Sequence, residues 1–128
     1  MVLCAPPTLQ PAGLRAGDGL LPPVRIESDL DRAIEGADVV MTLRMQLERM
    51  NSGFVPGTRE YSRLYQVNGE RLARAKPGAL VMHPGPMNEG VEISHEVAHG
   101  LQSRVEEQVA NGVAVRMAVL YLLARSRA

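Results

Sequence analysis

Short apolar runs alternate with amphipathic stretches along this chain of 128 residues. The apolar runs predict strands at residues 2–5, 24–27, 39–43 and 80–82. The run at 39–43 is almost wholly apolar, which is expected where both faces of a strand are covered. Strands that alternate with helical patterns are typical of parallel sheets. The pattern therefore predicts an α/β fold with a Rossmann-like parallel sheet and flanking helices.

Helix signals follow the second strand. Ser28 is the expected N-cap of a helix whose first turn carries Asp29 and Asp31, because acidic side chains favour the positive end of the helix dipole. Gly36 is the expected C-terminal stop of this helix.

The remaining helical pattern is uneven. Residues 69–75 predict a short helix, and the Gly- and Pro-rich segment 11–23 leaves room for only another short one. Residues 51–68 predict a long loop with at most one turn of helix. Apolar residues at spacings of three and four then predict a C-terminal helix over 103–126.

Composition narrows the class of protein. The 14 basic side chains equal the 14 acidic ones, so the net charge is near zero. Nucleic-acid and membrane-surface proteins need a sustained basic field, and neither class is expected here. Lys76 is the single lysine, so arginine carries almost all the positive charge. Arginine suits bidentate contacts with carboxylates, although a GC-rich genome would produce the same bias.

The single cysteine, Cys4, cannot form an internal disulfide, and its apolar surroundings favour a packing residue over a nucleophile. One unpaired cysteine fits a reducing cytoplasm. No run approaches the roughly 18 consecutive apolar residues of a membrane span. No basic segment precedes an apolar one as in a signal peptide. A soluble, cytoplasmic protein is expected.

Three polar side chains directly follow the third predicted strand: Arg44, Gln46 and Glu48. The end of a buried parallel strand lies at the carboxyl edge of the sheet, where ligands bind in open α/β folds. Whether this segment continues as a strand or begins a helix, Glu48 can support the Arg44 guanidinium. The alternative is a surface ion pair, worth less than about 1 kcal/mol.

The fourth predicted strand runs into His83-Pro84-Gly85-Pro86. A Gly–Pro bond prefers trans by only roughly 0.5–1 kcal/mol, so a cis bond is accessible. Such a turn presents backbone carbonyls at the same sheet edge. His83 by itself fits a core or edge histidine as well as a catalytic one. No aspartate or cysteine lies nearby at the spacing of a triad or a metal site, so neither a hydrolase nor a metal centre is predicted.

Three motifs resemble the aspartate carbamoyltransferase family. They are TLRMQLER at residues 42–49, HPGPMN at 83–88 and QVANGVAVR at 108–116. The resemblance covers the later part of that family's catalytic chain. It implies that residues 1–128 are a partial aspartate-binding domain, without the first β-α unit of that domain. It also implies that the helix at 103–126 packs on a carbamoyl-phosphate domain that is not present here.

The resemblance also implies roles for particular residues. The implied aspartate-binding residues are Arg44 and Gln46, and the backbone carbonyls of Gly85 and Pro86, across a cis bond, orient the carbamoyl group. The implied supporting residues are Glu48, Arg49 and His83. The loop over residues 50–66 would close the site when aspartate binds. Glu89 departs from the family, because many bacterial members have arginine there. The change of sign weakens the case for an anion contact at this position but leaves the two carbonyls unaffected.

The implied activity is transfer of a carbamoyl group from carbamoyl phosphate to L-aspartate, in de novo pyrimidine synthesis, with no metal or organic cofactor. The implied partners are the carbamoyl-phosphate domain, the other subunits of a homotrimer, and either a dihydroorotase or a regulatory chain. The Ser-Thr-Arg-Thr run that binds phosphate in this family is absent, so the segment alone is expected to be inactive. The near rival, ornithine carbamoyltransferase, would show a cysteine in the His-x-x-Pro turn and an Asp-rich strand exit. A non-catalytic module, either a fragment or a degenerate paralogue, is the alternative from another class.

Overall fold

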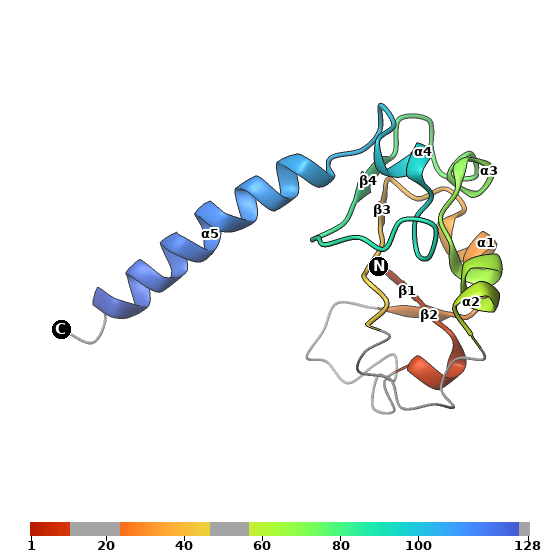
Figure 1. Ribbon diagram of the computed structural model, residues 1–128, viewed down its shortest axis with the longest axis horizontal. Helices are drawn as coiled ribbons and strands as arrows, with labels where there is room; N and C mark the ends of the chain where they lie inside the picture. Colours follow the sequence, from red (N-terminus) through yellow and green to blue (C-terminus); the bar gives the residue numbers. More distant parts are fainter. Residues whose placement is uncertain (11–23, 47–56, 126–128) are drawn as a thin grey trace.

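The computed structural model describes residues 1–10, 24–46 and 57–125, and Figure 1 shows its ribbon. Short strands and helices alternate along the chain. In order they are β1 (Val2–Cys4), the 3-10 helix η1 (Pro7–Leu9), β2 (Arg25–Glu27), α1 (Leu30–Ile34), β3 (Val39–Met41), α2 (Thr58–Tyr65), α3 (Gly69–Leu72), β4 (Leu80–Met82), α4 (His95–Ala98) and α5 (Val105–Arg125).

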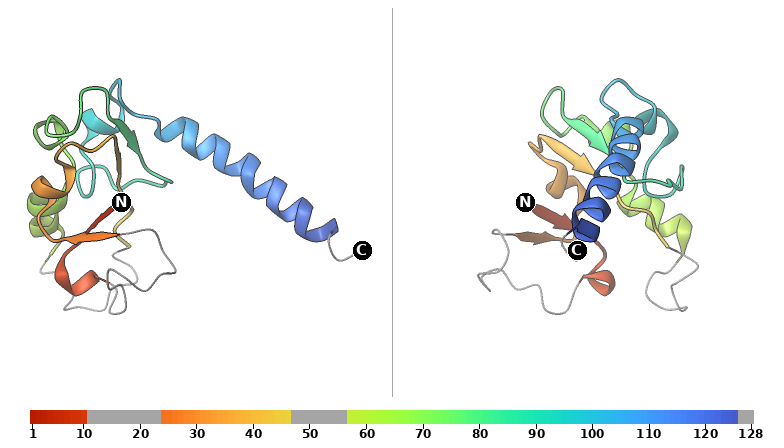
Figure 2. Two further views of the ribbon diagram at one scale, coloured as in Figure 1. Left: turned by 180° about the vertical axis from the view of Figure 1, so that it is seen from behind. Right: turned by 90° about the vertical axis from the view of Figure 1, so that its left-hand side faces the viewer.

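The four strands form two separate parallel pairs. Strand β1 pairs with β2, with Leu3 opposite Ile26, and β3 pairs with β4, with Val40 opposite Val81. Among the described residues no ladder joins the two pairs, which lie at different levels in Figures 1 and 2. All four predicted strands are present, and the parallel pairing confirms α/β character. Within the described residues the two pairs do not form one continuous sheet, and the sheet expected from the sequence was one that lacks its first β-α unit.

The hydrophobic core surrounds the β3–β4 pair. Val81 and Ile93 are fully buried at its centre. The other buried members of this cluster are Ile34, Val40, Val67, Ala75, Ala79, Val97 and Ala98. On the far edge of β4, the Val81 N–H donates to the Gln102 carbonyl, and the Arg104 N–H donates to the Val81 carbonyl. These two bonds fix the segment that leads into α5.

The covering of β3 differs from its prediction. Val40 is buried, but Val39 and Met41 are 46% and 51% exposed. One face of the strand therefore packs on the core, and the other is about half exposed. The strand also ends at Met41 instead of residue 43. An almost wholly apolar run was correctly assigned as a strand, but burial on both faces was wrong for these residues.

Helix α1 begins one residue later than predicted. Its N-cap is Asp29, whose carboxylate accepts hydrogen bonds from the Asp31 and Arg32 N–H groups. Ser28, the predicted cap, lies outside the helix, and its hydroxyl accepts a hydrogen bond from the Gln10 side-chain amide instead. Gly36 has φ of 67° just after the helix, as expected of a C-terminal stop.

Two helices were not predicted, and one is shorter than predicted. Residues 58–65 form α2, although they lie in the predicted loop 51–68. The Tyr61 and Tyr65 rings of α2 stack with centroids 5.3 Å apart, and the Tyr65 hydroxyl donates to the Ser28 carbonyl. Helix α4 had no predicted counterpart. Helix α3 spans four residues and stops before the predicted end at residue 75.

Helix α5 confirms the predicted C-terminal helix and projects away from the other elements (Figures 1 and 2). Its apolar side chains are exposed on all sides beyond its first two turns, including Met117, Leu120 and Leu122 at about two-thirds exposure. A helix that is apolar all round is normally buried against other structure. No helix in the described ranges is long and apolar enough to cross a bilayer.

Candidate functional site

The carboxyl ends of β3 and β4 lie side by side. The Thr42 N–H donates to the Met82 carbonyl at 3.0 Å, which extends the pairing past the strand ends. Further on, the Asn88 side-chain amide donates to the Met45 carbonyl at 2.9 Å. This bond joins the segment after β3 to the turn after β4, although 43 positions separate the two residues in the sequence.

Met45 anchors the first of these segments. Its side chain is 6% exposed, whereas its neighbours Arg44 and Gln46 are exposed. The buried Met45 side chain therefore leaves the Arg44 guanidinium and the Gln46 amide exposed at the sheet edge. Both groups suit an anionic ligand with carboxylate oxygens. Glu48 and Arg49, the predicted supports of Arg44, lie outside the described residues.

The turn after β4 has the predicted backbone. The Gly85–Pro86 bond is cis, and Gly85 has φ of 68°, in the left-handed region that favours glycine. The Gly85 N–H donates to His83 Nδ1 at 2.9 Å. A Cβ atom on Gly85 would lie 3.1 Å from Val109 Cγ2, so the beginning of α5 approaches this turn closely.

His83 is a fully buried support for this turn. Because Nδ1 accepts the Gly85 N–H, the ring proton is on Nε2 in the neutral form. Nε2 lies 3.3 Å from Glu92 Oε1 and donates to it. The same oxygen accepts the Asn88 N–H at 2.6 Å. The His83 ring thus connects the backbone of the turn to Glu92, and its side chain is enclosed within the protein.

Glu92 was missed by the sequence analysis. It is 1% exposed, and it joins His83 to the residue that holds the Met45 carbonyl. Its Oε2 atom is also buried and has no hydrogen-bond partner among the described residues. The local signal was a charged residue between Val91 and Ile93 in an apolar run, which by itself does not distinguish a buried carboxylate from one on an exposed strand face.

A groove of about 340 Å³ lies between the two strand pairs. Strands β1 and β3 line it together with α1 and the two stacked tyrosines, and Arg44 is also among the lining residues. Its walls are mostly apolar, which suits a hydrophobic segment better than a small anion. Cys4 lies in this groove, where burial and the Glu27 carboxylate raise the pKa of its thiol to about 11. A thiol with such a pKa stays protonated at neutral pH, which agrees with a packing role.

The comparison with protein families decides the assignment. Residues 18–123 match the model of the aspartate/ornithine carbamoyltransferase Asp/Orn binding domain. The chain belongs to this carbamoyltransferase family. The resemblance found in the sequence is thereby confirmed, and it extends over most of the chain.

Carbamoyltransferases from other organisms are similar in sequence and in structure. The aspartate carbamoyltransferase catalytic subunit of Gluconobacter oxydans (strain 621H) is 60% identical over 98% of this chain and 39% of its own length. An ornithine carbamoyltransferase from Burkholderia thailandensis E264 superposes with a TM-score of 0.73 at 26% identity, covering 93% of this chain and 37% of that one. An aspartate transcarbamoylase from Trypanosoma cruzi, in complex with carbamoyl phosphate, gives 0.63 at 27% identity, covering 77% and 30%.

Two further facts bear on this member of the family. The chain spans about two-fifths of the length of the curated relatives that it matches. Those relatives, at 53–60% identity, carry the name of the aspartate enzyme, whereas the ornithine enzyme from Burkholderia thailandensis is 26% identical. The turn from His83 to Pro86 has no cysteine, the feature expected of the ornithine rival.

Proposed function

We propose that this chain is the aspartate-binding part of an aspartate carbamoyltransferase. The full enzyme would join carbamoyl phosphate and L-aspartate to give N-carbamoyl-L-aspartate and phosphate, an early step of de novo pyrimidine synthesis in the cytoplasm. The observation that carries this proposal is the Asn88–Met45 hydrogen bond. It keeps the segment with Arg44 and Gln46 beside the Gly85–Pro86 turn.

In this proposal the two segments divide the work. The Arg44 guanidinium binds the side-chain carboxylate of aspartate, and Gln46 orients the substrate. The carbonyl oxygens of Gly85 and Pro86 accept hydrogen bonds from the carbamoyl amide and from the attacking amine. The His83–Glu92 pair supports these carbonyls from inside the protein, because it anchors the Gly85 and Asn88 N–H groups.

The reaction depends on the orientation of the two substrates more than on a strong base. The α-amine of aspartate attacks the carbamoyl carbon, a tetrahedral intermediate forms, and phosphate leaves as the amine loses its proton. Carbamoyl phosphate is already activated, and correct placement of two reactants can supply about 7–11 kcal/mol of a barrier. Phosphate binding falls to the carbamoyl-phosphate domain, and the mechanism requires no metal or organic cofactor.

Two surfaces support the proposal that further structure completes this domain. The groove between β1 and β3 has apolar walls, and the strand edges beside it pair with no other strand among the described residues. One additional strand would join the two pairs into a single parallel sheet. Helix α5 exposes apolar side chains on all sides, as expected of a helix that packs on a carbamoyl-phosphate domain. A homotrimer, with a dihydroorotase or a regulatory chain as a further partner, completes the proposed assembly.

The test is replacement of Arg44 in the full-length enzyme. Loss of a charge-assisted contact of about 1.5–3 kcal/mol predicts that Arg44→Ala lowers kcat/KM for aspartate by about tenfold to hundredfold, with a raised KM. The KM for carbamoyl phosphate should change little. Arg32→Ala is the matched control, because Arg32 is an exposed arginine on α1 with only a surface ion pair. Normal saturation with aspartate in Arg44→Ala would remove the assignment.

The 128-residue chain offers a second test against the non-catalytic alternative. Alone it is expected to be inactive, and mixing it with a separately produced carbamoyl-phosphate domain should restore carbamoyl transfer. Calorimetry with aspartate, with and without that domain, follows binding independently of turnover. Absence of both binding and activity in the mixture would favour a non-catalytic module.

A further inference from the structure

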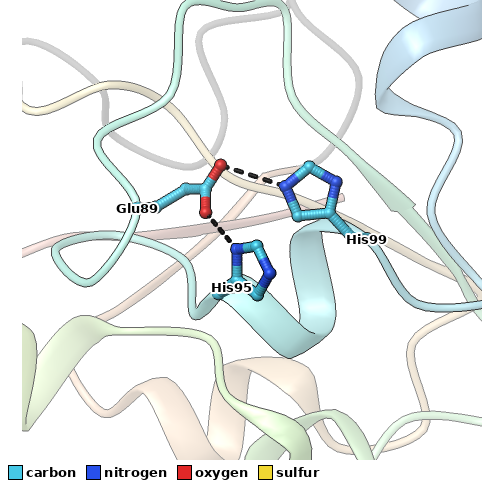
Figure 3. A group of neighbouring side chains, drawn as sticks. All are labelled: Glu89, His95 and His99. Atoms are coloured by element: carbon cyan, nitrogen blue, oxygen red, sulfur yellow. Dashed lines mark hydrogen bonds and ion pairs between the residues drawn. The ribbon is translucent and has the colours of Figure 1, made fainter.

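Glu89, His95 and His99 form a compact cluster outside the site described above (Figure 3). Glu89 Oε2 lies 2.6 Å from His95 Nδ1, and Glu89 Oε1 lies 3.0 Å from His99 Nε2. The two imidazole rings are 4.6 Å apart between centroids and tilted by 47°. All three side chains are exposed, so solvent reaches the donor atoms directly.

The fold brings these residues together in two steps. His95 begins α4 and His99 caps it, so the helical spacing of four places both rings on one side. Glu89 comes from the turn after β4, and the backbone on each side of it is fixed. The Asn88 N–H donates to Glu92, and the Gly90 N–H donates to the Ile93 carbonyl at 2.8 Å. The carboxylate is therefore held against the helix instead of swinging freely.

The donor set is that of a transition metal. It offers two imidazole nitrogens and one carboxylate oxygen, all within 4.8 Å of one another. Zinc binds such atoms at about 2.0–2.2 Å and uses two histidines with one glutamate in known protein sites, with water in the fourth position. Small side-chain rotations would close the present spacing around one ion. Imidazole ligands disfavour Mg²⁺ and Ca²⁺, which prefer oxygen alone.

We propose that Glu89, His95 and His99 bind one divalent transition-metal ion, with Zn²⁺ as the representative ion. The ion would bind the two ring nitrogens that now face the carboxylate, with the proton of each ring moving to its other nitrogen, and would tie the turn at Glu89 to α4. Because Glu89 follows Asn88, which holds the Met45 carbonyl, the bound metal would stiffen the turn next to the proposed aspartate site. The competing explanation is a pair of surface hydrogen bonds with no affinity for metal.

Calorimetric titration of ZnCl₂ into the metal-free chain at about pH 7.5 tests the proposal. We expect one equivalent to bind in the micromolar range. Each of Glu89→Gln, His95→Gln and His99→Gln should weaken binding by at least about tenfold, since even the loss of an outer-shell partner costs metal sites about 10- to 100-fold. Binding should also weaken towards about pH 5.5, because protons compete with the metal for imidazole. Cobalt(II) in place of zinc should give a visible absorption band that His99→Gln abolishes.

Two control variants locate the site. Glu96→Gln changes a carboxylate on the same helix that lies outside the cluster and bonds to Gly69, and Cys4→Ser removes the only thiol. Both should bind zinc like the parent chain. Because the three cluster side chains are exposed, their variants should keep the parent's far-ultraviolet circular dichroism, which separates loss of a ligand from loss of fold. Absence of zinc binding up to millimolar concentration, or an affinity in all three cluster variants equal to that of the parent chain, would overturn the proposal. Neither result depends on carbamoyl transfer, so the proposed function stands or falls separately.

Discussion

Gly85 and Gly36 form a natural pair for testing how α5 is held. Both have a left-handed backbone, with φ of 68° and 67°. An added Cβ atom on Gly36 would meet nothing within 4 Å, whereas on Gly85 it would lie 3.1 Å from Val109 Cγ2. An alanine at either position therefore has the same free-energy cost of a left-handed backbone. Only the alanine at position 85 would also contact α5.

The magnitudes follow from these contacts. A left-handed backbone destabilises alanine by roughly 1–2 kcal/mol. Alanine also lowers the conformational entropy of the unfolded chain, which offsets about 0.4–1 kcal/mol of this loss. Gly36→Ala should therefore lose about 1 kcal/mol of unfolding free energy. Gly85→Ala should lose about 1 kcal/mol more, the low end of the range for overpacking, because the half-exposed Val109 side chain can partly move away.

Urea unfolding of single and double variants measures this difference. In a Val109→Ala background the added Cβ has room, so the cost of Gly85→Ala should fall by about 1 kcal/mol. Gly36→Ala should cost the same in both backgrounds, because it is remote from Val109. The Val109 cycle also removes any effect of Pro86, since Pro86 is present throughout. A coupling energy between positions 85 and 109 within about 0.3 kcal/mol of zero would refute the contact between the turn and α5.

Two further predictions concern buried or partly buried groups. Glu92→Ala leaves the buried His83 ring N–H and the partly buried Asn88 N–H without an acceptor and should cost about 2–4 kcal/mol of unfolding free energy. Glu92→Gln keeps an acceptor oxygen and should cost less than half as much, and equal losses in urea unfolding would contradict this account. With its pKa raised to about 11 from 9.0, Cys4 should react with iodoacetamide roughly a hundredfold more slowly than an ordinary thiol at about pH 8. The same shift contributes stability that is fully present below pH 9.0 and lost as the pH rises through about 11, and Cys4→Ser should remove that part of the alkaline dependence. A Cys4 alkylation rate that levels off near pH 9.0 would be inconsistent with burial of the thiol.

Local pattern located the strands but not their pairing. Each apolar run is legible in the sequence, because burial selects Val, Leu and Ile within a few residues. Pairing of β1 with β2 and of β3 with β4 depends on contacts between distant segments, which no local window contains. The exposure of Val39 and Met41 has the same origin. An apolar strand face looks identical in sequence whether this chain or a further element covers it.

Polar residues show a similar division. Arg44 and Gln46 were predicted as site residues because they follow a strand and match a family motif, and that prediction stays open. The Gly85–Pro86 bond was predicted from its special backbone chemistry, and the cis bond confirms it. Glu92 was missed because its partners come from the tertiary fold. His95 and His99 have a readable helical spacing, but Glu89 joins them only through the turn. Helix α2 was missed because Gly53, Pro56 and Gly57 obscure where it begins.

The projection of α5 has a mechanical consequence. Its 21 residues extend about 30 Å at 1.5 Å per residue, and one contact near its base is Val109 against Gly85. A stiff rod held near one end works as a lever, so a force on its outer turns produces a displacement at the base. An element that packs against Leu120 and its neighbours would thereby displace the backbone that carries the Gly85 carbonyl. Contacts made at the outer end of α5 and the position of the Gly85 carbonyl oxygen would then be coupled through the contact between Val109 and Gly85.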